Sequence, residues 1–287
     1  MYKIRYINRY MHDLSEEETD LEMKGAMGGL YKLTEWITRI AFSNILWVIC
    51  TSPFLFIVLT KFLMAVQTPE AHNEQLLSNW ILGILSPFVL FPATAALFTV
   101  VRKWVMGNPD VSVFKTFFKG YKENYKQSMI GGIFYTLLFV IMYVDYTVYM
   151  TQLDGFQLVG IVMLVLLIVL FVSLFNFFSM TVHYEMKTTQ LLKNAVLLTL
   201  IRPFRVFSTL IGSAVLAYIG TQMPVLFVFF LFCLMALFAF FNFYATFTKM
   251  QEQQEKMKKA EEEESETEQA LLESMDSAKK GENGSKP

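Results

Sequence analysis

Six stretches of the chain are apolar over about 20 residues, the length that a helix needs to cross the hydrocarbon core of a bilayer. The stretches lie at residues 36–64, 81–101, 129–150, 157–182, 204–222 and 224–247. We expect each to be a helix, because lipid offers no partner to unpaired backbone groups. The alternation typical of barrel strands is missing, for example from Leu158 to Val172. The pattern predicts an all-α, polytopic membrane protein with six transmembrane helices.

Positive charge is distributed unequally between the two sides of this six-helix pattern. Of the 24 Lys and Arg residues, all but Lys61 fall on the side that holds both chain ends. The loops on the other side carry Glu70, Glu74, Asp145 and Asp154. Because Lys and Arg concentrate in cytoplasmic loops, the asymmetry predicts a multi-pass protein of the cell membrane with both termini in the cytoplasm.

One cytoplasmic connection, from Val111 to Gln127, has the pattern of a helix that lies in the membrane interface. Its aromatic residues follow helical spacing along one face: Phe114, Phe117, Phe118, Tyr121 and Tyr125. Its lysines form a neighbouring stripe: Lys115, Lys119, Lys122 and Lys126. Near the anionic inner leaflet each Lys contributes about 1 kcal/mol of attraction. Two interpretations stay open, an elbow helix that only orients the third span and a face on which a cytoplasmic partner docks.

A second connection, from Lys187 to Arg202, predicts another cytoplasmic elbow helix, which is more apolar than the first. The residues of its inner face are Leu191, Leu192, Ala195, Val196, Leu198 and Thr199. Pro203 then begins the fifth span, where a missing amide hydrogen costs little. The segments Ala96–Gly131 and Phe178–Gly212 share the same order of span end, elbow and span start, a pattern typical of parallel repeats.

Three parts of the chain follow from this pattern. Residues 1–33 form a charged cytoplasmic segment, residues 34–248 the six-helix transmembrane domain, and residues 249–287 a charged tail. Acidic residues outnumber the lysines of the tail, and its apolar residues are too few for a core. We expect the tail to be a solvated helix that frays into disorder.

Two kinds of irregular residue lie inside the predicted spans. Asn44, Asn176 and Asn242 all fall roughly 8–11 Å from the cytoplasmic boundary, which suits a polar layer facing a common pathway. Interhelical hydrogen bonding is the alternative interpretation. Prolines interrupt the first two spans at Pro53, Pro87 and Pro92. Broken helices expose backbone groups that often surround a ligand, although kinks that only serve packing are common.

The sequence offers little support for catalysis or for a cofactor. The three His residues are scattered, and neither a metalloprotease motif nor a phosphate-binding loop is present. Cys50 and Cys233 lie inside spans, where thiols behave as small apolar groups. The net charge of −1 leaves no electrostatic footprint for nucleic acid. We therefore expect no enzyme, no metal site and no cofactor.

Several motifs resemble those of the YesL family of bacterial membrane proteins, whose function is undetermined. The first block is Gly28-Gly29-Leu30, Trp36, Asn44, Trp47 and Pro53. The second block is Pro92-Ala93-Thr94-Ala95-Ala96-Leu97, Trp104 and Phe117-Phe118. Later blocks are Tyr121-Lys122-Glu123-Asn124-Tyr125-Lys126-Gln127-Ser128 and Leu192-Lys193-Asn194-Ala195 with Pro203. The resemblance covers roughly 25–247 and implies six spans and an association with carbohydrate utilisation, because family members are often encoded beside importers of plant oligosaccharides.

The leading hypothesis is a non-enzymatic accessory or transport component of the cell membrane, linked to oligosaccharide uptake. Its partners would be the anionic inner leaflet and a transporter or cytosolic protein that docks on Phe117, Phe118, Tyr121 and the four lysines. The Glu-Ala-Ala loop by which importer permeases dock their ATPase is missing from the sequence. Two alternatives stay open: a scaffold or regulator that recruits cytosolic proteins through its tail, and a substrate-binding membrane subunit. The ligand and the oligomeric state cannot be predicted.

Overall fold

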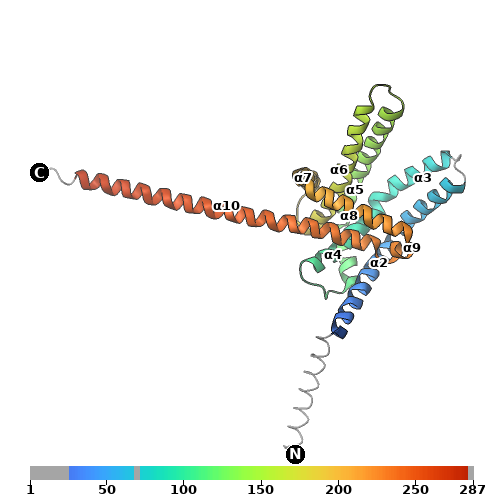
Figure 1. Cartoon of the computed structure of the whole chain (residues 1–287), viewed down its shortest axis with the longest axis horizontal. Helices are drawn as coiled ribbons and strands as arrows, with labels where there is room; N and C mark the ends of the chain where they lie inside the picture. The colour runs from blue at the N-terminus through green and yellow to red at the C-terminus, as the bar shows by residue number, and fades with distance from the viewer. Residues whose placement is uncertain (1–25, 68–71, 284–287) are drawn as a thin grey trace, which may run out of the picture. The chain divides into compact units, whose positions relative to one another are not determined.

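The computed structural model describes residues 26–67 and 72–283, and every regular element within these ranges is helical, as predicted (Figure 1). The helices are α2 (Ala26–Gln67), α3 (His72–Leu85), α4 (Phe91–Val105), α5 (Val113–Thr151), α6 (Gln157–His183), α7 (Thr188–Ile201), α8 (Pro203–Gln222), α9 (Pro224–Leu226) and α10 (Phe232–Asn283). Two short π-helices precede α4 and α10: η1 (Ser86–Leu90) and η2 (Phe227–Leu231). Most of the predicted N-terminal segment 1–33 lies outside the described residues, and its last part belongs to α2.

The chain divides into two compact units, Met1–Phe240 and Phe241–Pro287. In the second unit α10 continues without a break to Asn283, and its surface is exposed from Lys249 to Glu264. Phe243 and Phe247, one turn apart, stack with ring centroids 6.5 Å apart. The predicted disorder at the chain end, residues 284–287, lies outside the described residues.

Within the described residues, five helices are long and apolar enough to cross a membrane, which is the pattern of a multi-pass membrane protein. They are Gly28–Gln67, Glu74–Val105, Val113–Thr151, Gln157–His183 and Pro224–Glu264. The predicted fifth span, residues 204–222, is not among them. Its helix α8 has 20 residues and carries Arg205 in its first turn. Six spans are therefore not confirmed.

The predicted boundary between the first elbow and the third span does not exist. A single helix of 39 residues, α5, runs from Val113 to Thr151 and includes both. No proline interrupts this stretch, and the buried residues Phe117, Gly120 and Tyr135 keep helical spacing across the expected break. The second elbow, in contrast, is a separate helix, α7, which buries Leu191, Leu192, Ala195 and Thr199.

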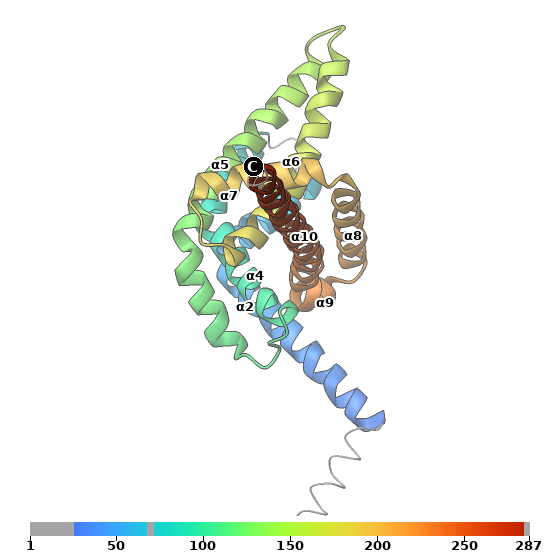
Figure 2. The ribbon, with the colours of Figure 1, turned by 90° about the vertical axis from the view of Figure 1, so that its left-hand side faces the viewer.

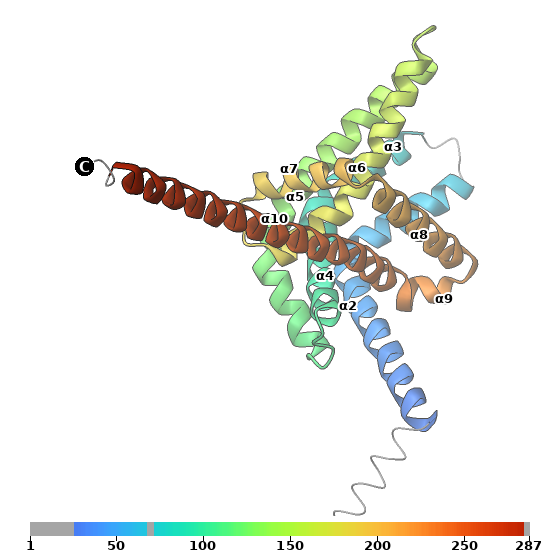
Figure 3. The ribbon, with the colours of Figure 1, turned by 60° about the vertical axis from the view of Figure 1, so that its left-hand side comes forward.

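Helix α4 is enclosed by other helices of the first unit. It contacts α2, α5 and α6, and Figure 3 shows it among them. Ala93, Ala95 and Ala96 have no exposed surface. On the facing side of α5, a Cβ added at Gly132 would lie 2.7 Å from the Cα of Pro87. Small residues on both sides thus let the two backbones approach closely.

Two helical hairpins use the same kind of contact. In Figure 2, α5 and α6 run side by side toward the turn at residues 152–156. Gly131 of α5 lies directly against the ring of Phe177, and Gly212 of α8 lies against the ring of Phe238. These glycines close the two segments, Ala96–Gly131 and Phe178–Gly212, in which the sequence shows parallel order.

Candidate functional site

The two π-helices create unusual backbone surroundings inside the apolar helices. A π-helical turn holds more residues than an α-helical turn and is frequent at functional sites. Both π-helices contact α2. Each also ends directly before a phenylalanine, Phe91 after η1 and Phe232 after η2. Asn44 of the first span and Pro87 and Pro92 of the second span lie in or next to these segments.

Asn44 of α2 binds the backbone of η2 with its whole carboxamide. Its Nδ2 donates to the carbonyls of Phe227 at 3.1 Å and Val228 at 2.7 Å. Its Oδ1 accepts from the amide of Cys233 at 2.9 Å. The side chain has no exposed surface. The carboxamide therefore joins Val228 and Cys233, two backbone groups at the spacing that a further π-helical hydrogen bond would join.

Trp47, one turn beyond Asn44, connects α2 to both helices that follow a π segment. Its ring stacks on Phe232 with centroids 3.9 Å apart. Its Nε1 donates to Thr94 Oγ1 at 3.1 Å, and Thr94 in turn donates to the Leu90 carbonyl of η1 at 2.7 Å. Only 2% of Trp47 is exposed. Trp47 thus fixes α4 and the start of α10 to the same face of α2.

The prolines are placed differently from one another. Pro87 is buried in η1 and packs on Gly132, as described above, and Pro92 is buried in the first turn of α4. Close to both, the Tyr125 hydroxyl donates to the Phe88 carbonyl at 3.4 Å. Pro53 is exposed in the middle of an unbroken α2. The two prolines of the second span therefore belong to one packed region, and Pro53 does not.

The three asparagines predicted to share a layer contact different elements. Asn44 binds η2, whereas Asn176 of α6 donates to Thr199 Oγ1 of α7 at 2.9 Å. Asn242 belongs to the second unit, where its carbonyl accepts from Thr246 at 2.9 Å. Each described bond of Asn44 and Asn176 goes to the protein itself. The pathway that these residues were predicted to line stays a prediction.

The first part of α5 separates an apolar face from a cationic one. Phe117 has no exposed surface, Phe118 and Tyr121 are half-buried, and Gly120 lies against Thr99 of α4. Asn124 also donates to Thr99 Oγ1, at 3.2 Å. All four lysines of the stripe are exposed: Lys115, Lys119, Lys122 and Lys126. One of them, Lys119, has a loose ion pair with Glu123 at 3.8 Å. The stripe is therefore held on a helix that is anchored to α4.

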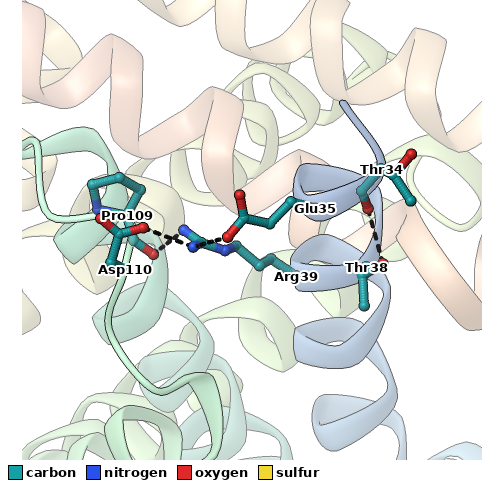
Figure 4. A network of polar contacts seen from close by, with 6 residues as sticks. All are labelled: Thr34, Glu35, Thr38, Arg39, Pro109 and Asp110. Carbon is teal, nitrogen blue, oxygen red and sulfur yellow. Dashed lines mark hydrogen bonds and ion pairs between the residues drawn. The ribbon is translucent and has the colours of Figure 1, made fainter. Parts of the chain in front are cut away.

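An arginine that the sequence did not single out holds the loop at the start of this helix. Figure 4 shows Arg39 of α2 between Glu35, on its own helix, and Pro109 and Asp110 of the loop. Its guanidinium lies 2.8 Å from the Asp110 carboxylate and also donates to the Pro109 carbonyl. Asp110 thus pairs with Arg39, and α5 begins three residues later, at Val113. No sequence signal connects two residues so far apart in the chain.

The structure adds no candidate for metal or cofactor binding. In residues 26–67 and 72–283, no three His, Cys, Asp or Glu side chains gather as a metal site. Glu35 and Asp110 form ion pairs with Arg39, and Glu123 forms one with Lys119. What the site offers is a buried hydrogen-bond network around Asn44 and Trp47 and an exposed cationic face on α5.

Comparison with known proteins identifies relatives of this chain. The family described as "Protein of unknown function, DUF624" matches residues 40–146. In Bacillus subtilis (strain 168), the uncharacterized protein YteU is 31% identical over 180 residues, which cover 62% of this chain and 67% of YteU. The uncharacterized protein YesL is 28% identical over 185 residues, 64% of this chain and 72% of YesL.

A third relative also comes from Bacillus subtilis. The uncharacterized protein YesV of the same organism is 29% identical over 154 residues, 52% of this chain and 74% of YesV. No solved structure matches the chain. The predicted resemblance to YesL is confirmed. The chain belongs to the DUF624 family of proteins of unknown function, together with these YesL-like proteins of Bacillus subtilis.

Proposed function

We propose that this membrane protein is a non-enzymatic accessory component of a transport system, which docks a partner on the cationic face of α5. The observation that carries the proposal is the arrangement of residues 113–127. Phe117 and Gly120 are buried against other helices, whereas the four lysines of the stripe are exposed. A rigid helix that presents regularly spaced cations suits an acidic protein surface beside the anionic inner leaflet.

The hydrogen bonding of the interior favours an accessory role over a substrate-binding subunit. A ligand site at a broken helix needs backbone or amide groups that are available to the ligand. Both polar atoms of the Asn44 side chain instead form hydrogen bonds with the backbone of η2 and α10. Asn176 bonds to Thr199. These hydrogen bonds of Asn44 and Asn176 thus support packing between helices.

The link to carbohydrate uptake rests on the resemblance to the YesL family. Neither the helices nor the lysine stripe has chemistry specific to sugars. The link is tested by growth of a deletion strain on single plant oligosaccharides as the carbon source. We expect slower growth on at least one oligosaccharide and unchanged growth on glucose. Equal growth on all of them would remove carbohydrate uptake from the proposal and leave the docking role to be tested separately.

Docking is tested by purification from native membranes in mild detergent. The variant replaces Lys115, Lys119, Lys122 and Lys126 with Gln. The matched control replaces four exposed lysines of α10 with Gln: Lys249, Lys256, Lys258 and Lys259. We expect a transporter subunit to purify with the wild type and the control and to be lost from the stripe variant. Recovery of the wild type as a single protein would contradict the proposal.

A second candidate function is a scaffold that recruits cytosolic proteins through the tail. The observation in its favour is the long exposed helix of the second unit, which carries Glu261, Glu262, Glu263 and Glu264. Deletion of residues 250–287 separates the two candidates. Loss of the co-purifying partner on deletion would favour the scaffold, whereas retention of the partner would favour docking on α5.

A further inference from the structure

Arg102 lies near the end of α4, a helix that packs on α6. It belongs to the last turn of α4, whose end is marked by the bond from the Met106 amide to the Arg102 carbonyl at 3.0 Å. One turn earlier, Phe98 packs on Phe178 of α6 with ring centroids 5.5 Å apart. His183 is the last residue of α6, five positions after Phe178. The last turns of α4 and α6 thus both follow this aromatic contact.

The guanidinium of Arg102 lacks the partners that such a group normally has. Its Nε has no accessible surface and donates no hydrogen bond. None of the ion pairs in the described part of the chain includes Arg102. Arg39, at the same predicted cytoplasmic end, binds two carboxylates and a carbonyl. Glu35 and Asp110 thus pair with Arg39, whereas Arg102 has no ion pair among the described residues.

An unpaired buried donor is costly, at about 1–3 kcal/mol, and more for a charged group. A water molecule could accept the Nε–H bond, but it would leave the charge uncompensated. An anion would accept the Nε–H hydrogen bond and would also neutralise the positive charge of the guanidinium. Nε and one terminal nitrogen of a guanidinium form a planar fork that matches two oxygens of a phosphate.

We propose that Arg102 binds a phosphate group at the adjoining ends of α4 and α6. The phosphate belongs either to an anionic lipid of the inner leaflet or to a soluble phosphate compound, since basic sites between helices at the cytoplasmic side suit both. The proposed site uses Arg102 of α4 and none of the four lysines of the stripe, and it does not depend on the docking proposal.

Thermal melting of the purified full chain in a neutral detergent tests this site. The additives are phosphatidylglycerol, phosphatidylcholine and inorganic phosphate, each titrated separately. The variant is Arg102→Gln, and the matched control is Lys103→Gln, which removes the same charge from the neighbouring exposed position. We expect phosphatidylglycerol to stabilise the wild type and the control, and to bind Arg102→Gln about tenfold more weakly. Phosphatidylcholine should not distinguish the three proteins.

The other outcomes are also decisive. Stabilisation by inorganic phosphate that depends on Arg102 supports the site and assigns it to a soluble compound. Equal responses of wild type, control and Arg102→Gln to every additive overturn the proposal. If Arg102→Gln does not fold, Arg102→Lys serves instead, because it keeps the charge but loses the planar fork. An unchanged affinity of Arg102→Lys for both phosphate compounds then overturns the proposal.

Discussion

The Asn44 carboxamide donates to the Val228 carbonyl at 2.7 Å, although 184 positions of sequence separate the two residues. The same side chain accepts from Cys233, so it completes the backbone hydrogen bonding where η2 passes into α10. Asn44 also belongs to the segment that matches the DUF624 family. The bond connects α2, early in the chain, with η2, late in the chain.

Replacement of Asn44 by Leu is expected to destabilise the protein by about 2 kcal/mol, because three buried backbone groups lose their partner and hydrogen bonds inside membranes each contribute about 0.6 kcal/mol or more. Chemical unfolding in detergent micelles measures the effect. The control is Asn79→Leu, since Asn79 is exposed on α3. Equal unfolding curves for both variants would show that the Asn44 bonds contribute nothing to stability.

Replacement of Gly132 by Ala should destabilise the protein by about 1–3 kcal/mol through overpacking, because the new Cβ would lie 2.7 Å from the Pro87 Cα. Gly29→Ala is the matched control. Gly29 is also helical, but a Cβ there would have no atom within 4 Å. Both variants gain the same helix propensity, about 1 kcal/mol. Their difference in melting temperature therefore isolates the steric effect, and a difference of zero would exclude close packing of α5 on Pro87.

The topology is tested by labelling single cysteines in a Cys50→Ala, Cys233→Ala background. Asn108→Cys should react only with reagents applied from the cytoplasm, and Asp154→Cys only with reagents applied from outside. Met223→Cys, at the end of α8, decides the number of spans. We expect it to react from outside, as the predicted six-span topology requires. Reaction from the cytoplasm would instead leave five spans and place α8 on the inner side.

Replacement of Arg39 by Gln should release the loop between α4 and α5. The loop would lose the bonds to Pro109 and Asp110, whereas the contact between Trp36 and Trp104, with centroids 5.5 Å apart, would remain. We expect faster amide hydrogen exchange in residues 106–112 and little change in the melting temperature. Lys32→Gln, an exposed cation on the same helix, is the control. Unchanged exchange in the loop would mean that Arg39 does not hold it.

Apolar length and periodicity were sufficient to predict most helices, but not their ends. The expected break before the third span rested on a change in composition between Lys126 and Gly131, and composition alone does not end a helix. Proline is the residue that most strongly interrupts a helix, because it lacks the amide hydrogen and clashes with the preceding turn. No proline lies between Val113 and Thr151, so α5 continues.

The contacts of the candidate site could be predicted only in part. Asn44 and Pro92 stand out because polar residues and prolines are rare inside spans. Their contacts could not be predicted in the same way. Asn44 binds backbone atoms of η2, and every residue has the same backbone carbonyl, so the sequence does not indicate which one is bound. The residues Phe227 to Leu231 have no sequence pattern that is specific to a π-helix. Similarly, the pair of Arg39 and Asp110 depends on how α2 meets a loop that follows α4.

The Asn44 bonds also bear on how the chain is made. Synthesis at about 5–20 residues per second means that Asn44 waits roughly 10–40 seconds until Val228 has left the ribosome. During that interval a carboxamide in an early membrane helix has no lasting partner. A chain that stops before η2 would retain this unsatisfied amide permanently, and such a defect is what membrane quality control can detect. The last membrane helix is therefore needed to give a polar side chain of the first helix its hydrogen-bond partners.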